Sequence, residues 1–509
     1  MRCLERNRVW TLAARVRQNL MLNFCGILCS DMFPKRGLAA SLLAMICSIA
    51  WAADDSTIRT LPQPVARVLS AHNLRTADFS AYIQEVGQDN PILEINPDIA
   101  RNPASTIKLL TTWLALETLG PAYTWKTEAY LDGPVGSGFL EGDLYLKGYG
   151  DPYMVLERYW LFLRKMRQQG LRHVTGDIVI DNSYFDLPSA NSGEFDGQAA
   201  RSYNVIPDAF MVNFQTVRFT FEPDLATNRV KVIAEPEPVN LQIRNRLVLK
   251  GGCGGYQRGI GFSIARPPGN SEVDLSGSFG RSCKPYSISR AVLQAPTFAY
   301  GVFRSLWEES GGTVQGGVRV DVVPDDIDAF VTMKSPPLSE VIRGVNKWSN
   351  NIMARHIFLT MGAEEYGSPA TLSKSRDAAR RYLAERNLNF TELKLENGAG
   401  LSRDTRISAR SLGRLLVAAG DSIFQPEFVS SLAIAGMDGT MRRRFRDEAL
   451  SGRMHLKTGR LSGVFALAGY VVSKTGRQFA FVAIHNGPGA DKGPGEEAHS
   501  ALLRWVYRQ

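Results

Sequence analysis

The sequence predicts an α+β protein in which a β-rich region interrupts a domain of helices and strands. Apolar residues recur at helical spacing before residue 121 and again from residue 295, whereas residues 131–287 consist of short strand-like runs separated by turns. At 509 residues the chain is long enough for two or three domains. We therefore expect a domain made of residues 54–130 and 288–509, and an inserted β-rich region of one or two lobes made of residues 131–287.

The mature chain opens, at residues 60–106, with a short helix pattern followed by alternating strands. The next helical pattern begins at Ser105 and stops at Gly120-Pro121, a helix-ending pair. One further pattern, at residues 155–170, interrupts the β-rich region. Later helices are expected at residues 295–312, 338–362, 408–420 and 495–509, with strands joined by turns at residues 454–488.

The first 52 residues have the features of a leader. Met32 is followed by basic Lys35 and Arg36, by an apolar run from Gly37, and by Ala50-Trp51-Ala52. This is the layout of a secretory signal cleaved after Ala52, and we predict that translation begins at Met32. The alternative is a retained membrane anchor, which would need about 20 apolar residues. The apolar stretch is short for such an anchor.

Most of the net charge of +9 belongs to this leader. Residues 1–52 hold seven of the 59 Lys and Arg residues and two of the 50 Asp and Glu residues, so they carry +5 and the rest of the chain carries +4. A charge of +4 is ordinary at this length, so nucleic-acid binding loses its main support. We expect the basic run Arg442–Arg446 to be a solvated face.

Cysteine and histidine usage bears on disulfides and metals. Four of the six cysteines lie in the leader, which leaves Cys253 and Cys283. In an oxidising compartment two cysteines most simply form one disulfide, and two buried free thiols are the alternative. The six histidines show no paired spacing, so neither a metal site nor a cofactor is expected.

Ser105 and Lys108 stand three residues apart at the start of a helix. Positions i and i+3 share one helix face, so the Lys108 amine can reach the Ser105 hydroxyl. A serine needs a base to become a nucleophile, and a lysine serves if burial or nearby positive charge lowers its pKa. The helix N-terminus favours negative charge where an oxyanion would form. Alone, the S-x-x-K pattern is weak evidence, and a capping serine beside a solvated lysine is the simpler explanation.

Two further motifs follow in chain order. Ser349-Asn350-Asn351 lies between two helical patterns, where a hydroxyl could relay a proton; helix capping is the alternative. Lys457-Thr458-Gly459 comes third. The order S-x-x-K, S-x-N, K-T-G is typical of penicillin-binding proteins and serine β-lactamases, and the joint occurrence is far more specific than any one motif.

Longer stretches resemble the serine D-alanyl-D-alanine carboxypeptidase/endopeptidase family of the penicillin-binding protein 4 type, low-molecular-mass class C. They cover nearly all of the mature chain and include NPASTIKLLTTWLALETLG, GDLYLKGYGDP, GDIVIDNSYFD, NKWSNNIMARHI, ENGAGLSRDTRIS, AGMDGTMRRRF and HLKTGRLSGVFALAGYV. That family separates its first two motifs by a long insertion, and here Ser105 and Ser349 stand 244 residues apart.

The resemblance implies a penicillin-binding/β-lactamase-like domain, with an antiparallel sheet flanked by helices, and an inserted region. It also implies a periplasmic carboxypeptidase that acts on peptidoglycan muropeptides and is inhibited by β-lactam antibiotics. It leaves open D,D-endopeptidase cleavage of crosslinks between stems, and a homodimer.

Carried over motif by motif, the resemblance implies a role for each residue. Ser105 is the acylated nucleophile, Lys108 is its base, and Ser349 passes the proton to the leaving D-Ala nitrogen. Asn351 orients the substrate and Lys108. The terminal carboxylate is recognised by Lys457, Thr458 and Gly459.

Two positions depart from the usual pattern of the family. Arg460 replaces a small hydroxyl residue that often follows K-T-G. Its N–H, with that of Ser105, is expected to form the oxyanion hole. Its guanidinium, beside the carboxylate pocket, could change substrate preference or β-lactam sensitivity. Residues 397–400, Asn-Gly-Ala-Gly in place of the commoner Asp-Gly-Ser-Gly, are expected to form a turn near the site.

Two rival functions share these motifs. A class A serine β-lactamase places its deacylating Glu after S-x-N, whereas the nearest candidate here, Glu222, precedes Ser349. A catalytically silent peptidoglycan-binding relative should have lost at least one motif residue, and all are intact. We therefore expect the carboxypeptidase.

Asp196 and the second KTGR sequence complete the candidates. Asp196 is a hypothetical partner for an amine on the third residue of a stem peptide, with a surface turn as the alternative. The second KTGR, Lys474–Arg477, lies between two apolar runs, and Thr475-Gly476 is typical of a turn, so it is predicted to be a hairpin tip. It should lie about 25–30 Å from Lys457.

Overall fold

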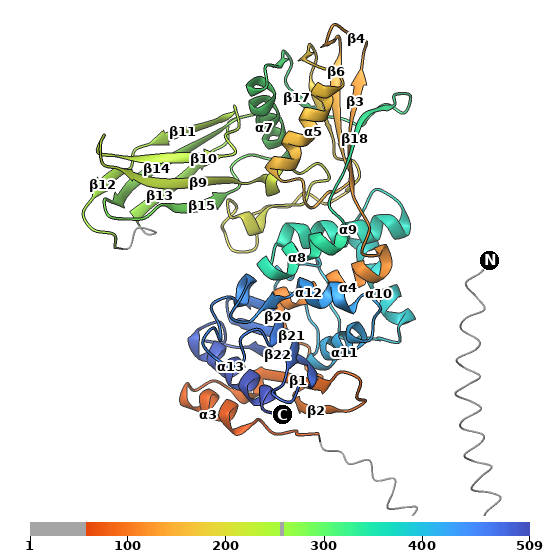
Figure 1. The fold of residues 1–509 in the computed structure, drawn as a ribbon, viewed down its shortest axis with the longest axis vertical. Coiled ribbons are helices and arrows are strands. Elements are labelled where there is room, and N and C mark those ends of the chain that lie inside the picture. Colours follow the sequence, from red (N-terminus) through yellow and green to blue (C-terminus); the bar gives the residue numbers. More distant parts are fainter. Residues whose placement is uncertain (1–56, 255–258) are drawn as a thin grey trace, which may run out of the picture. The chain divides into compact units, whose positions relative to one another are not determined.

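The computed structural model describes residues 57–254 and 259–509 (Figure 1). The predicted leader of residues 1–52, with its signal segment and start at Met32, lies outside the described residues. Within residues 57–254 and 259–509, no helix is both long and apolar enough to cross a membrane.

A six-stranded antiparallel sheet joins the two ends of the described chain. Its strand order is β19-β20-β21-β22-β1-β2, so strands from the N-terminal part pair with strands from the C-terminal part. The bounds are β1 Phe79–Glu85, β2 Pro91–Ile95, β19 Ala433–Ile434, β20 Met454–Leu461, β21 Val464–Val472 and β22 Gln478–Asn486.

Helices cover both faces of this sheet (Figure 1). On β21, Phe465 and Leu467 pack into a cluster with the first and last helices, whereas Ala466, Ala468 and Tyr470 face the helices that follow the first two motifs. Because alternate strand residues point to opposite faces, burial on both sides requires apolar residues throughout.

The helices on the two faces have the following bounds. On one face lie α3 Gln63–Ala71 and α13 Gly493–Tyr507, and the helical part beside the other face contains α4 Lys108–Leu119, α8 Leu338–Trp348, α9 Asn351–Tyr366, α10 Leu372–Glu385, α11 Ala409–Gly420 and α12 Gln425–Ser431. The predicted α+β fold, an antiparallel sheet flanked by helices, is confirmed.

Residues between α4 and α8 form three further sheets. A seven-stranded sheet contains β9 Val217–Asp224, β10 Arg229–Glu235, β11 Leu241–Asn245, β12 Val248–Lys250, β13 Ile260–Ala265, β14 Ser271–Gly280 and β15 Tyr286–Arg290. A five-stranded sheet has the order β17-β8-β6-β3-β18, and a four-stranded one β16-β7-β5-β4. Their bounds are β3 Lys126–Asp132, β4 Val135–Gly136, β5 Phe139–Leu140, β6 Asp143–Gly148, β7 His173–Val174, β8 Ile178–Asp181, β16 Thr313–Val314, β17 Val318–Val320 and β18 Ala329–Lys334.

The strands of these sheets extend from Lys126 to Lys334, a wider span than residues 131–287. Among the described residues of this span, the helices α5 Leu156–Gln168 and α7 Ala295–Glu309 share one buried apolar cluster with the strands. The domain boundaries at residues 54–130, 131–287 and 288–509 stay a prediction.

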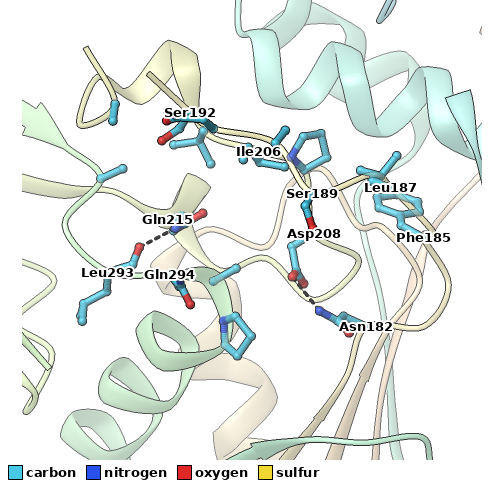
Figure 2. A pocket seen from close by; sticks show the side chains of 18 of the residues that line it. Asn182, Phe185, Leu187, Ser189, Ser192, Ile206, Asp208, Gln215, Leu293 and Gln294 are labelled. Atoms are coloured by element: carbon cyan, nitrogen blue, oxygen red, sulfur yellow. Dashed lines mark hydrogen bonds between the residues drawn. The ribbon is translucent and has the colours of Figure 1, made fainter. Parts of the chain in front are cut away.

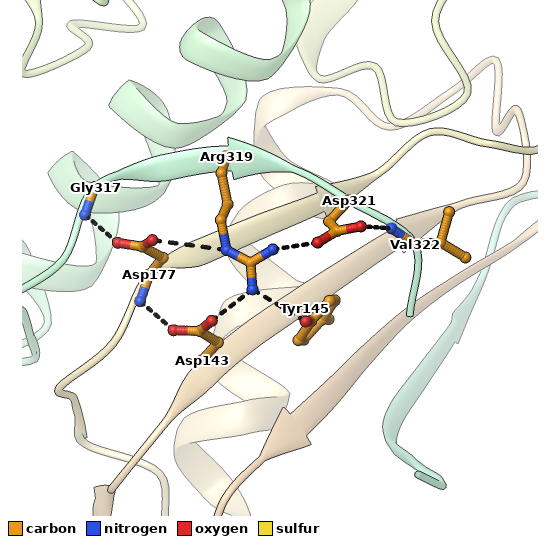
Figure 3. A network of polar contacts seen from close by, with 7 residues as sticks. All are labelled: Asp143, Tyr145, Asp177, Gly317, Arg319, Asp321 and Val322. Carbon is orange, nitrogen blue, oxygen red and sulfur yellow. Dashed lines mark hydrogen bonds and ion pairs between the residues drawn. The ribbon is translucent and has the colours of Figure 1, made fainter. Parts of the chain in front are cut away.

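One ionic network ties the outer strand β17 to its neighbours (Figure 3). The Arg319 guanidinium lies 2.7 Å from the Asp143 carboxylate on β6, 3.7 Å from the Asp177 carboxylate before β8 and 2.6 Å from the Asp321 carboxylate. It also donates to the Tyr145 hydroxyl at 3.1 Å. Arg319 thus reaches across β8 to β6, and these bonds raise its pKa further above the ordinary arginine value.

The disulfide Cys253–Cys283 links the segment after β12 to the segment before β15. The predicted pair is confirmed. The two cysteines are 30 residues apart in sequence, and closing a loop of this length in the unfolded chain corresponds to about 3–4 kcal/mol of stabilisation. The crosslink therefore stabilises the seven-stranded sheet.

Candidate active site

Ser105 lies in a short 3₁₀ turn, Ala104–Ile107, that leads directly into α4. Lys108 is the first residue of α4, and its Nζ lies 2.9 Å from the Ser105 hydroxyl oxygen. The structure thus brings together the serine and the lysine of the first motif.

The Lys108 amine is fully buried, and none of its hydrogen-bond partners in the described part of the chain is a carboxylate. It donates to the Asn351 side-chain oxygen at 2.7 Å and to the Ala399 carbonyl. Burial, with the positive charges of Lys457 and Arg355, holds the pKa of Lys108 well below its usual value. The site therefore favours a neutral amine that can accept a proton.

The Ala399 carbonyl comes from the turn predicted at residues 397–400. Gly400 has a φ of +76°, and a Cβ at this position would lie 2.0 Å from the Ala104 carbonyl oxygen. The 3₁₀ turn Ala104–Ile107 is called here the serine turn. Only glycine permits so close an approach between residues 397–400 and the serine turn. Sequence reasoning placed the turn near the site but missed the role of the Ala399 carbonyl, because any residue type supplies a carbonyl.

The second and third motifs meet at a hydrogen bond between Ser349 and Lys457. Ser349 joins α8 to α9 in the left-handed region, at φ +60°, and its hydroxyl accepts from Lys457 Nζ at 2.8 Å. Lys457 also donates to the Thr458 carbonyl at 2.9 Å. Burial lowers the pKa of Lys457 to about 7.

Strand β20 carries the third motif past the serine turn. A Cβ on Gly459 would lie 2.6 Å from the Pro103 carbonyl oxygen and 3.0 Å from the Ser105 nitrogen. The main chain of β20 therefore lies directly beside that of Ser105. In the described residues the pairing of β19 with β20 reaches Leu456 and goes no further, which leaves the outer edge of β20 from Lys457 onward without a strand partner.

The side chains of Thr458 and Arg460 point to different neighbours. The Thr458 hydroxyl donates to the Thr440 hydroxyl at 3.0 Å. The Arg460 guanidinium pairs with Glu496 on α13 and lies 5.1 Å from the centre of the Phe465 ring. Its positive charge is thus matched by a carboxylate of the last helix.

Asp196 lies in an exposed loop before the strands of the seven-stranded sheet. Its carboxylate accepts hydrogen bonds from Tyr203, Asn204 and the Gln198 N–H, all within its own loop. Burial acts to raise its pKa, but these hydrogen bonds hold the pKa of Asp196 below the ordinary value. The structure therefore shows its carboxylate bonded to neighbours in the loop rather than to the three motifs.

The second KTGR sequence forms the turn between β21 and β22. The Ser473 N–H donates to the Arg477 carbonyl at 2.8 Å, and Gly476 adopts a φ of +88°. The Lys474 N–H donates to the carbonyl of Tyr507. The predicted hairpin tip is confirmed.

The described residues form several cavities, and two of them have volumes of about 590 Å³ or more. One, of about 650 Å³, adjoins the second motif and is lined by Tyr203, Phe214, Trp348 and Asn351 among others. The other, of about 590 Å³, is lined by none of the predicted site residues (Figure 2). In it Asp208 accepts from the Asn182 side chain at 2.8 Å, and burial raises the pKa of Asp208 to about 6.

Across residues 57–254 and 259–509, no cluster of three or more His, Cys, Asp or Glu side chains could hold a metal ion.

Comparison with known proteins gives matches over most of the chain. Residues 61–509 match the model of the D-Ala-D-Ala carboxypeptidase 3 (S13) family. The chain is 29% identical over 402 residues to the D-alanyl-D-alanine carboxypeptidase of Actinomadura sp. (strain R39), covering 76% of this chain and 73% of that protein. It is 23% identical over 406 residues to the D-alanyl-D-alanine carboxypeptidase DacB of Haemophilus influenzae, covering 79% of this chain and 84% of that protein.

The fold is also similar to that of solved structures. The crystal structure of penicillin binding protein 4 (dacB) from Haemophilus influenzae is similar with a TM-score of 0.73 and 21% sequence identity, covering 88% of this chain and 100% of that chain. A second structure of that protein, complexed with a β-lactam, gives a TM-score of 0.70 at 20% identity, with the same coverage. The predicted penicillin-binding type of fold is confirmed.

The close approach at Gly459 generates a prediction. Gly459→Ala should lower the free energy of unfolding by about 1–3 kcal/mol, because the added Cβ forces β20 away from the serine turn. Thermal unfolding measures the change. Gly136→Ala is the matched control, since Gly136 also lies in a strand but a Cβ there meets no atom within 4 Å. Equal melting temperatures for the two variants would contradict the close approach.

Proposed function

The chain belongs to the D-Ala-D-Ala carboxypeptidase 3 (S13) family, and we propose that it hydrolyses the D-alanyl-D-alanine ends of peptidoglycan stem peptides through an acyl-enzyme on Ser105. It is a serine-type carboxypeptidase. The observation that carries the assignment of Ser105 is its contact with the buried Lys108 amine, which has no carboxylate partner among the described residues.

Lys108 is proposed to act as the base. A neutral amine has two N–H groups and one lone pair. The Asn351 side-chain oxygen and the Ala399 carbonyl can only accept, so they take the two N–H groups. The lone pair then faces the Ser105 hydroxyl at 2.9 Å and takes its proton as the serine oxygen attacks the substrate carbonyl.

The oxyanion is proposed to bind between the N–H groups of Ser105 and Arg460. The contact of Gly459 with the main chain of Ser105 supports this, because it brings the two backbones together. In other enzymes one donor of this kind contributes about 2.7–4 kcal/mol to catalysis. The Arg460 side chain is turned to Glu496, so we propose that Arg460 acts here through its main chain.

Ser349 and Lys457 are proposed to serve the leaving group. Ser349, hydrogen bonded to Lys457, passes a proton to the D-Ala nitrogen as the peptide bond breaks. Lys457, Thr458 and Gly459 form the carboxylate site. A bound carboxylate would raise the pKa of Lys457 from about 7 and favour its charged form. Water then hydrolyses the ester on Ser105 and restores the free enzyme.

Location and inhibition follow from the same proposal. The signal pattern before Ala52 supports export to the periplasm, where peptidoglycan stems are found. A β-lactam presents a strained amide and a carboxylate that resemble the D-Ala-D-Ala end, so we propose that it acylates Ser105 as well. Endopeptidase activity and a homodimer stay predictions of the resemblance.

Acylation of Ser105 tests the assignment. Protein treated with a fluorescent penicillin should gain one adduct, located on Ser105 by peptide mass spectrometry. Ser105→Ala should lose labelling and carboxypeptidase activity by roughly a thousandfold or more, because in residues 57–254 and 259–509 the hydroxyl bonded to the Lys108 amine is that of Ser105. Labelling of another residue in folded protein would refute the assignment, and rapid turnover of nitrocefin would favour the β-lactamase alternative.

The two KTGR sequences provide a matched pair. Lys457→Ala should slow penicillin acylation roughly a hundredfold, since it removes both the carboxylate contact and the partner of Ser349. Lys474→Ala alters the same residue type in the hairpin tip and should acylate as the unmodified protein does. The reverse result would assign the site to the second copy.

The lowered lysine pKa predicts a pH dependence. Acylation should fall in acid as Lys108 is protonated and loses its lone pair, with a midpoint well below the ordinary lysine value of 10.5. Acylation rates between about pH 5 and about pH 10 measure it. Lys108→Arg should be inactive throughout, because a guanidinium keeps its proton. A midpoint near 10.5 would contradict a basic role for Lys108.

A further inference from the structure

A loop between β8 and β9 is docked on the helix that carries Asn351. This segment, residues 196–205, is called here the Tyr203 loop. The Asn351 amide nitrogen donates to the Tyr203 carbonyl at 3.2 Å, and the Arg355 guanidinium donates to the Val205 carbonyl at 2.9 Å. Asn351 and Arg355 are four residues apart on α9 and so share one helix face. The loop is therefore held at two points by one face of α9.

The Tyr203 carbonyl selects the orientation of the Asn351 amide. With the nitrogen donating to that carbonyl, the oxygen faces Lys108 at 2.7 Å. The reverse orientation would set the amide oxygen against the Tyr203 carbonyl oxygen and the amide nitrogen against the Lys108 amine. A main-chain oxygen of the Tyr203 loop thus determines which Asn351 atom contacts the proposed base.

Asp196 holds this loop in shape. Its carboxylate accepts from the Tyr203 hydroxyl at 2.7 Å, from the Asn204 amide at 2.7 Å and from the Gln198 N–H at 3.0 Å. The Asn204 amide also donates to the Gln198 carbonyl at 3.0 Å. These bonds link both ends of the loop and fix the residue whose carbonyl meets Asn351.

We propose that Asp196 is a positioning residue: it shapes the Tyr203 loop so that the Tyr203 carbonyl holds the Asn351 amide against Lys108. The inference rests on the proposed roles of Ser105 and Lys108. It gives Asp196 a different role from the recognition of a substrate amine that its sequence context suggested. Asp196 would then be needed for acylation of Ser105 by every substrate, including a penicillin, which carries no stem peptide.

Loosening the loop would also change the surroundings of the base. Arg355 from α9 and Lys457 from β20 are the charged groups that act on Lys108, and Arg355 is held by the Val205 carbonyl of the same loop. If the loop departs, water reaches Arg355 and the Lys108 amine, and the charged form of Lys108 becomes less unfavourable. A positioning role therefore predicts a change in pH dependence as well as in rate.

The test compares Asp196→Ala and Asp196→Asn in the full chain, with penicillin acylation of Ser105 followed against pH. Asp196→Ala removes the acceptor and should slow acylation by about tenfold to a hundredfold, with the pH midpoint moved upward. Asp196→Asn keeps an oxygen acceptor but no charge and should restore most of the rate. Asp224→Ala is the matched control, because Asp224 closes its own exposed turn through Ala226 and Thr227.

The alternative role gives a different pattern. If Asp196 binds a substrate amine, Asp196→Ala and Asp196→Asn should acylate normally with penicillin and lose activity only on amine-bearing peptides, which would overturn the proposal. Normal acylation rates and an unmoved pH midpoint in Asp196→Ala would overturn the positioning role too. In that case, labelling of Ser105 in the unmodified protein would still support the proposed function. Failure to label Ser105 in the unmodified protein would reject both.

A second variant covers the case in which Asp196→Ala does not fold. Tyr203→Phe removes the hydroxyl that donates to Asp196 but keeps the ring and the carbonyl. It should slow acylation severalfold and move the pH midpoint in the same direction. Tyr130→Phe, which removes a hydroxyl bonded to Glu128 in the five-stranded sheet, should leave both unchanged. Equal acylation by the two tyrosine variants would overturn the proposal.

Discussion

The rest of the site depends on one constraint: the Lys108 amine is buried, and its partners in the described structure are a hydroxyl, an amide oxygen and a carbonyl rather than a carboxylate. An isolated ammonium group is costly to bury, so Lys108 is most stable there as a neutral base. Carbonyl and amide oxygens from two other segments satisfy its N–H groups, namely Ala399 and Asn351. Their arrangement leaves the serine hydroxyl as the neighbour of the lone pair.

This environment exists because three segments from distant parts of the sequence converge on the serine turn. Two glycines permit the contact: Gly400 lies against the Ala104 carbonyl, and Gly459 lies against the Pro103 carbonyl and the Ser105 nitrogen. A side chain at either position would separate the turn from its neighbours. The geometry around Ser105 thus depends on main-chain packing as much as on the side chains of the three motifs.

The sequence was sufficient to predict some of the side-chain contacts of the site. The spacing of Ser105 and Lys108 implied the contact between them, and the order of the motifs identified Asn351 and Lys457. It could not reveal contacts made by backbone carbonyls, such as those of Ala399 and Tyr203, since these do not depend on residue type. The direction of the Arg460 side chain toward α13 was equally hidden, because its partner Glu496 lies 36 residues away in sequence.

The extent of the inserted sheets was also beyond sequence reasoning. The fold class was predicted from helical and strand-like periodicity, but short strands such as Val318–Val320 carry little periodic signal of their own. They are defined by pairing with strands more than a hundred residues earlier, for example Val318 with Ile178. Register between distant segments is a tertiary property that a single sequence does not display.

The disulfide has a practical consequence for studying this enzyme. Cys253 and Cys283 are the two cysteines of the described residues, and their disulfide joins the segments after β12 and before β15. Cys253 is exposed, whereas Cys283 is 6% exposed and belongs to the buried apolar cluster beside the seven-stranded sheet, so reduction would present the Cys253 thiol to solvent and leave the Cys283 thiol buried. The Cys253 thiol is then an attachment point for a spectroscopic label, so movements of the segment after β12 during turnover can be followed without introducing a new cysteine.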